Sequence, residues 1–252
     1  MKSIQSARNK RLNIYHLIDF SHQRFTADGL TSFGNTAVFS REPKEAKEIA
    51  ASADGIFIHM GSTKASELEP LILAGIEANK RGIPIVLDPA DAAHSSFHHR
   101  LVKKLLETIS FTAIKGNPED MACIADVTWS ARDTNSAEQD YSKRESIALR
   151  IAKQYNTVAI VTGKADLIAE FSDVTANHTG HPYLARITGA GCLLGSLLTA
   201  CLTTDTPKFI AAYEAAQFFG DTAEKAATLY GVNGPGTFTP HFIDALGGPL
   251  KH

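Results

Sequence analysis

Short apolar segments alternate with amphipathic segments through the middle of the chain, and this alternation limits the possible folds more than any other feature. Apolar runs typical of buried strands lie at residues 55–61, 84–88 and 111–114, roughly 28 residues apart. Segments with helical periodicity follow them at residues 64–81, 100–108 and 118–125. Strands and helices in this alternation indicate βαβ units, and hence an α/β fold with a parallel sheet covered on both faces.

The rest of the chain extends this pattern. Residues 157–163 have the sequence of another buried strand, and residues 165–171 and 173–178 are typical of an antiparallel pair that turns at Ser172-Asp173. Residues 127–141 are polar and are expected to form a surface excursion, and helices are expected at residues 143–154, 192–202, 207–230 and 240–246. Because no linker rich in Pro, Gly or Ser divides the chain, residues 1–252 are expected to form a single domain.

Composition and charge exclude several classes of protein. Lys and Arg number 25 against 27 Asp and Glu, and a net charge of −2 gives no general reason to bind nucleic acid or an anionic membrane. The 3 cysteines form no C-x-x-C pair, which disfavours a zinc or dithiol site. No apolar run approaches the roughly 20 residues of a membrane span. The basic N-terminus lacks the apolar region of a signal peptide, so a cytoplasmic location is expected.

Polar clusters follow three of the predicted strands: Asp88-Pro89, residues 115–117 (Lys-Gly-Asn) and Thr162-Gly163. In open α/β sheets, ligands bind at the carboxyl ends of the strands. These clusters therefore predict the location of a ligand site, whatever the function.

Several histidines could suggest a metal site. His94 and His98 are four residues apart and His99 is adjacent, but no carboxylate or Cys completes a ligand set, so a polar loop entering a helix is favoured. His59 lies on a buried strand and is interpreted as a satisfied core histidine. His181, which precedes a proline, is interpreted as structural.

Residues 189–192, Gly-Ala-Gly-Cys, open an apolar helix. Small residues at a helix N-terminus let an anion approach bare N–H groups. The positive end of the helix dipole also lowers the pKa of a nearby thiol, so Cys192 could be a reactive thiolate. The alternative is a tight turn into a packed helix, with Cys192 as a small buried apolar residue. The glycines do not form a Rossmann fingerprint, and no Walker A pattern occurs in the chain.

This segment carries a family resemblance. His181-Pro182, followed by Arg186-Ile-Thr-Gly-Ala-Gly-Cys192, resembles the signature of hydroxyethylthiazole kinases, a family of the ribokinase-like superfamily. Other stretches agree in order and spacing: Phe25-Thr-Ala-Asp-Gly-Leu30, Leu87-Asp-Pro89, Ile114-Lys-Gly-Asn117, Val161-Thr-Gly163 and Gly234-Pro-Gly-Thr-Phe238. Most ribokinase-like enzymes have Asp where this chain has Cys192. The resemblance covers about residues 12–247 and implies a ribokinase-like α/β fold with a mostly parallel central sheet.

The resemblance implies ATP-dependent phosphorylation of the primary alcohol of 4-methyl-5-(2-hydroxyethyl)thiazole in thiamine salvage, with Mg2+ as cofactor. It implies a homotrimer with active sites between subunits, and no nucleic-acid or membrane partner. It assigns the catalytic position to Cys192 and the anion hole for the transferred phosphoryl group to Gly189, Ala190 and Gly191. It also implies ATP contacts at Lys115, Asn117, Thr162 and Gly163, magnesium binding near Asp88 and Asp120, and substrate contacts at Phe39, Gly189 and Asp19.

The N-terminal substrate segment departs from the family pattern. Asp19 and Asp28 stand where the family has neutral amides, Phe39 replaces a thioether, and Asp91 replaces a glycine. An altered alcohol pocket is one interpretation, so two alternatives stay open: a kinase of another small heterocyclic alcohol, and a relative that binds ligand without turnover. Simpler interpretations also exist for single residues. Asp120 could only favour the dipole of its helix, and Lys115 could be a solvated strand end.

Overall fold

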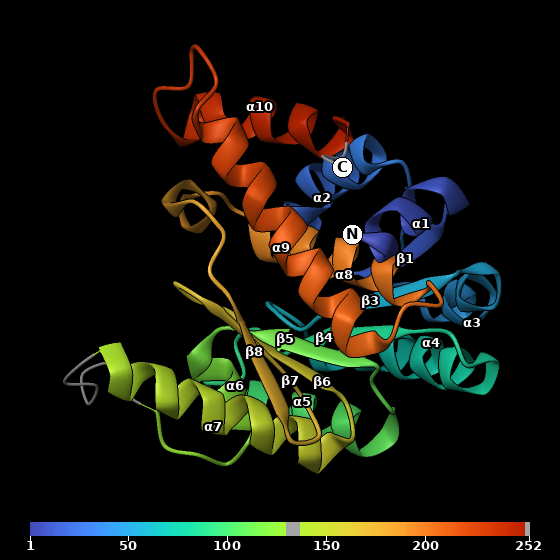
Figure 1. The fold of residues 1–252 in the computed structure, drawn as a ribbon. Helices are drawn as coiled ribbons and strands as arrows, with labels where there is room; N and C mark the ends of the chain where they lie inside the picture. Colours follow the sequence, from blue (N-terminus) through green and yellow to red (C-terminus); the bar gives the residue numbers. More distant parts are fainter. Residues whose placement is uncertain (130–136, 250–252) are drawn as a thin grey trace.

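The computed structural model describes residues 1–129 and 137–249 (Figure 1). The strands are β1 (Asn13–Leu17), β2 (Thr36–Phe39), β3 (Gly55–His59), β4 (Ile85–Asp88), β5 (Ala113–Gly116), β6 (Val158–Val161), β7 (Asp166–Glu170) and β8 (Asp173–Asn177). The α-helices are α1 (Lys2–Lys10), α2 (Phe20–Phe33), α3 (Pro43–Ser52), α4 (Leu68–Arg81), α5 (Ser96–Thr108), α6 (Pro118–Ile124), α7 (Ala137–Tyr155), α8 (Ala190–Leu202), α9 (Lys208–Ala227) and α10 (Pro235–Gly247). Short 3-10 helices occupy η1 (Ala65–Glu67) and η3 (Pro182–Arg186).

The strands form one sheet in the order β2-β1-β3-β4-β5-β6-β7-β8. Strands β1 to β6 run parallel to one another, whereas β7 and β8 are each antiparallel to their neighbours. This confirms the predicted α/β fold and the antiparallel pair in residues 165–178. The register pairs His59 with Asp88 and Gly116 with Val161, so the carboxyl ends of the parallel strands lie side by side along one end of the strands.

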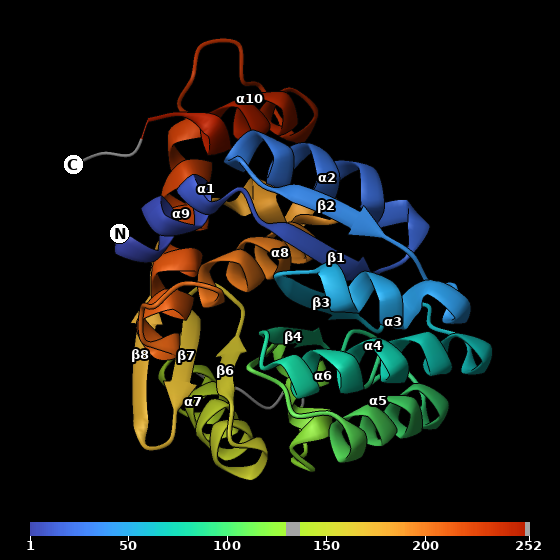
Figure 2. The ribbon, with the colours of Figure 1, turned by 90° about the vertical axis from the view of Figure 1, so that its right-hand side faces the viewer.

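Helices cover both faces of the sheet. Helices α1, α2, α8, α9 and α10 lie on one face, and α3 to α7 lie on the other (Figures 1 and 2). Each face buries its own apolar cluster. Helix α8 is apolar almost all round and packs on β3 and β4, where Gly195 lies against the ring of Phe57.

Local signals fix the ends of several elements. Gly82 ends α4 in the left-handed region, with φ of 70°. Pro118 lies at the first turn of α6, and the Asn117 side chain accepts a hydrogen bond from Asp120 N. Local sequence therefore fixes where α4 ends before β4 and where α6 begins after β5.

Some predicted boundaries were wrong. Helix α7 begins at Ala137, inside the expected polar excursion, and residues 130–136 lie outside the described residues. Strand β5 extends to Gly116, so Lys115 lies within the strand. The five elements before residue 53 were not predicted. Among the described residues, no helix is long and apolar enough to cross a membrane.

Candidate active site

A buried ion pair lies where β4 and β5 end. The Lys115 Nζ atom is 2.6 Å from Asp88 Oδ2, and it donates a second hydrogen bond to the carbonyl oxygen of Gly191 at 3.0 Å. The side chains are only 3% and 9% exposed. Lys115 is therefore not a solvated strand end. It joins two strand ends to the first turn of α8.

The glycines at the start of α8, Gly189 and Gly191, have close neighbours. Gly189 has φ of 90°, and a Cβ atom there would lie 3.3 Å from Phe25 Cδ1. A Cβ atom at Gly191 would lie 3.3 Å from Lys115 Nζ. Helix α8 begins at Ala190, and no side chain of the described residues caps it. Ala190 N donates to the carbonyl oxygen of Ile187 at 3.4 Å, so the N–H groups that an anion can approach in this turn are those of Gly191 and Cys192, not that of Ala190.

Cys192 lies in that first turn and is 2% exposed. Burial raises the pKa of its thiol to about 12, and the negative charge of Asp88 adds to the increase, while Lys115 opposes it. This burial favours the alternative interpretation, in which Cys192 is a small buried residue with a neutral thiol. Cys192 presents a neutral thiol to the site.

Asp120 is a buried carboxyl group with partners on both oxygens. Its Oδ1 atom accepts a hydrogen bond from Ala93 N at 2.9 Å, and its Oδ2 atom accepts one from Asn117 Nδ2 at 2.7 Å. Burial raises its pKa, and the negative charge of Asp88 acts in the same direction. Because the two carboxylates repel each other, a cation shared between them would be favoured. Carboxylate oxygens are the ligands that Mg2+ prefers, so these residues fit a magnesium site.

Thr162 and Gly163 lie at the end of β6, on the same edge of the sheet. The Thr162 hydroxyl donates to the carbonyl oxygen of Gly116 at 3.1 Å, and Gly163 N donates to Asp166 Oδ1 at 3.1 Å. A Cβ atom at Gly163 would lie 2.7 Å from Arg144 Nη1. These contacts tie the residues after β6 to the end of β5.

The predicted substrate residues lie at the ends of β1 and β2. Asp19 caps α2 by accepting from Ser21 N at 2.9 Å and from Ser21 Oγ at 2.5 Å, and these hydrogen bonds lower its pKa. The ring of Phe39 lies 5.0 Å from that of His16. The backbone oxygen of Asp19 accepts from His22 N at 3.1 Å, and a ring nitrogen of His22 lies within 4.8 Å of the Cys192 sulfur.

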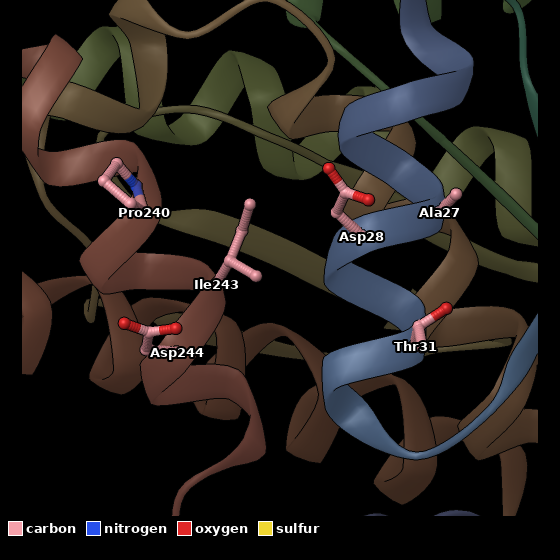
Figure 3. Close-up of a pocket in the computed structure, with 6 residues that line it drawn as sticks. All are labelled: Ala27, Asp28, Thr31, Pro240, Ile243 and Asp244. Atoms are coloured by element: carbon pink, nitrogen blue, oxygen red, sulfur yellow. The ribbon is translucent and has the colours of Figure 1, made fainter.

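The other two acidic departures, Asp28 and Asp91, have partners of their own. Asp28 pairs with Arg24 at 3.7 Å, its side chain is 53% exposed, and it lines a separate pocket of about 410 Å3 between α2 and α10 (Figure 3). Asp91 keeps the left-handed backbone suited to glycine, with φ of 67°, and accepts from Ser62 N at 3.0 Å. Asp28 thus belongs to another pocket, and for the other departures the altered alcohol pocket stays a prediction.

Two histidines at the site were not assigned to it from the sequence. The rings of His22 and His59 lie 5.2 Å apart. Their ligand nitrogens and the Cys192 sulfur lie within 4.8 Å of one another. The Nδ1 atom of His59 is buried and has no hydrogen-bond partner within residues 1–129 and 137–249, so the interpretation of a satisfied core histidine was wrong. The position of His59 at the carboxyl end of a parallel strand was the signal that could have found it.

The remaining histidines have local roles. His94 lies 3.6 Å from Asp91, the backbone N–H of His98 donates to the helix cap Ser95, and His99 Nδ1 lies 2.8 Å from Cys123 Sγ. They thus have separate partners. The ring of His181 caps η3 by accepting from Tyr183 N, which confirms its structural role.

Comparison with known proteins agrees with this arrangement. The model of the hydroxyethylthiazole kinase family matches residues 4–248. The chain is 37% identical to hydroxyethylthiazole kinase 1 of Oceanobacillus iheyensis, over 96% of this chain and 94% of that protein. The structure of a hydroxyethylthiazole kinase protein from Pyrococcus horikoshii OT3 is similar, with a TM-score of 0.88, 26% identity, and coverage of 98% of this chain and 91% of that one.

A more distant structure shows the wider fold. A ribokinase-like superfamily protein from Enterococcus faecalis superimposes with a TM-score of 0.63 at 11% identity, over 95% of this chain and 88% of that one. This likeness confirms the ribokinase-like α/β fold. With nearly all of its length matched by the family model and by relatives of that family, the chain belongs to the hydroxyethylthiazole kinase family.

Proposed function

We propose that the protein transfers the γ-phosphoryl group of ATP to the primary alcohol of 4-methyl-5-(2-hydroxyethyl)thiazole, as a kinase of thiamine salvage in the cytoplasm. One observation carries this proposal beyond family membership: the uncapped first turn of α8 lies directly against the buried Asp88–Lys115 pair. Bare N–H donors, a cation and carboxylates thus meet at one edge of the sheet. This is the combination that phosphoryl transfer needs, because its catalysis is mainly positioning and neutralisation of charge.

Each group has a role in that reaction. The N–H groups at Gly191 and Cys192 would receive the charge that develops on the oxygens of the transferred phosphoryl group. Lys115 adds a fixed positive charge beside them, and Asn117, Thr162 and Gly163 border the nucleotide. Gly189 and Ala190 let the chain turn into α8 without a side chain in the way.

Magnesium would be held by Asp88 and Asp120, directly or through water. When bound, Mg2+ neutralises phosphate charge. The residues themselves prepare the site, since Ala93 N and Asn117 Nδ2 hold the Asp120 carboxylate in place.

Cys192 acts as a neutral thiol that positions the acceptor hydroxyl. A thiol with a pKa of about 12 is not an effective base at neutral pH. Because the transition state is loose, the attacking oxygen does not need full deprotonation before it reacts. We expect Cys192→Ala to lower kcat while leaving ATP affinity nearly unchanged, whereas Cys192→Asp, which introduces the usual superfamily residue, retains or raises activity. Full activity in Cys192→Ala would contradict this role.

A second acceptor class is favoured by one observation. Asp19 places a carboxylate, its pKa lowered by Ser21, three residues before His22, whose ring nitrogen lies within 4.8 Å of the Cys192 sulfur. A basic ring alcohol would pair with that charge. An ADP-release assay over thiazole, pyrimidine and pyridine alcohols separates the possibilities. ADP released only with the thiazole alcohol supports the first proposal, preference for a basic ring supports the second, and no acceptor-dependent release in any case would indicate a binding protein.

We also propose that the protein is a homotrimer with Phe39 of a neighbour at each site. The partly buried Phe39 lies on β2, which is an edge strand of the sheet, and this supports the proposal. Light scattering should give three times the 27.1 kDa chain mass under assay conditions. An active monomer would rule out the trimeric site.

A further inference from the structure

His22 and His59 have no role in the phosphoryl-transfer chemistry described above, yet they form a cluster with Cys192, which has one. Its members come from three separate elements: the first turn of α2, the end of β3 and the first turn of α8. Their ligand atoms lie within 4.8 Å of one another. Two imidazole nitrogens and one sulfur form a much softer donor set than the carboxylates of Asp88 and Asp120.

The surroundings leave these side chains available. The ring of His59 lies over Gly61. A Cβ atom at position 61 would lie 3.1 Å from His59 Nδ1, so the glycine makes room for the ring. That Nδ1 atom is buried without a hydrogen-bond partner among the described residues, which is a costly state for a polar atom.

We propose that His22, His59 and Cys192 form a binding site for a soft divalent cation, Zn2+, with three protein ligands and a fourth position open to water. Zinc bonds of about 2.0–2.3 Å place the ligand atoms of a tetrahedral site about 3.3–3.6 Å apart. The cluster must therefore contract by at most about 1.5 Å. The half-buried His22 ring, on the first turn of its helix, supplies this movement by side-chain rotation. The Cys192 thiol releases its proton to solvent as the sulfur binds the metal.

This site differs from the magnesium site in both ligands and consequence. Zn2+ prefers nitrogen and sulfur here, whereas Mg2+ prefers the oxygens of Asp88 and Asp120. In the proposed kinase reaction the thiol faces the acceptor hydroxyl, so bound Zn2+ excludes the acceptor. That consequence rests on the proposed function, but metal binding itself does not.

The test is titration of the reduced, metal-free full-length protein with Co2+, followed by displacement with Zn2+, in the absence of nucleotide and alcohol. We expect one equivalent of Co2+ per chain, with the ultraviolet band of thiolate-to-cobalt charge transfer, and loss of the spectrum on adding Zn2+. His22→Ala, His59→Ala and Cys192→Ala should each weaken binding by more than about 100-fold, since loss of even an outer-shell partner costs about 10- to 100-fold.

Cys123→Ala is the matched control. Its thiol lies 2.8 Å from His99 Nδ1 and forms a second thiol–imidazole pair on other elements, so this variant should bind Co2+ as the wild type does. Should His59→Ala fail to fold, His22→Ala, altered on a half-buried helical turn, still decides the matter. Unchanged binding in His22→Ala, or loss of the band in Cys123→Ala, would overturn the proposal. Because the titration contains no ATP, failure of the kinase assay would leave its result standing.

Discussion

Replacing Asp88 by Asn should destabilise the protein far more than loss of a surface ion pair. The substitution keeps the shape of the side chain but removes the negative charge 2.6 Å from Lys115 Nζ. The Lys115 side chain is 3% exposed and the Asp88 side chain 9% exposed, so water cannot take over the lost partner. Removal of one member of a buried pair costs about 3–5 kcal/mol, against about 0–1 kcal/mol for exposed pairs. A loss of that size is a large part of a typical stability of about 5–15 kcal/mol.

Urea unfolding at pH 7 in EDTA, monitored by circular dichroism, measures the effect without any contribution from bound cations. The comparison needs the wild type, Asp88→Asn, Lys115→Met and the double variant Asp88→Asn/Lys115→Met. The double variant buries no unpaired charge, so it should be more stable than Asp88→Asn alone. A loss below about 1 kcal/mol in Asp88→Asn, or a double variant no more stable than that single one, would refute this reasoning.

Three further predictions concern packing, pH and magnesium. Gly195→Ala should lower the stability measured by thermal unfolding by about 1–3 kcal/mol, because a Cβ atom there overlaps the Phe57 ring. Gly236→Ala in α10 should raise the stability slightly, because a Cβ atom there meets no atom of the described residues within 4 Å. His16 is fully buried, and burial lowers its pKa from 6.5 to about 4. Its contribution to the free energy of unfolding is therefore complete above pH 6.5 and is lost as the pH falls toward 4, by up to about 3 kcal/mol. Urea unfolding at pH 7 and pH 5 should show a weaker pH dependence in His16→Gln, and an equal dependence would exclude His16 as the cause. Asp120→Ala should reduce both the rate of ADP release and its dependence on Mg2+ in a coupled assay. If turnover is unchanged, and nucleotide stabilises the variant and the wild type equally, Asp120 is only a charge at the start of α6.

Local sequence patterns predicted the central elements because each has its own signal. Gly82 ends α4, Pro118 begins α6, and apolar runs mark β3, β4 and β6. The first 53 residues lack such contrast. For example, Asn13–Leu17 is a strand that includes a buried His16, whose partner Ser196 lies 180 residues away. A pattern within one segment cannot show a pairing of that range.

The site divides in the same way. The strand-end rule correctly located Asp88 and Lys115, since register alone brings those ends together. The chemical state of Cys192 could not be predicted, because helix position lowers a thiol pKa while burial raises it, and only the structure shows how complete the burial is. His22 and His59 were not grouped because they come from helices and strands far apart in the chain.

The arrangement of helices on the two faces of the sheet has a consequence for synthesis on the ribosome. The face covered by α3 to α7 can be completed from residues 13–170, which emerge early, whereas the opposite face awaits α8 to α10, from residue 190 onward. Helix α1 emerges first, yet Ser3 in it hydrogen-bonds Glu214, 211 residues later. Until the last third of the chain is made, one apolar side of a parallel sheet therefore faces water, and this is the interval in which the nascent chain is most exposed to aggregation and most in need of a chaperone.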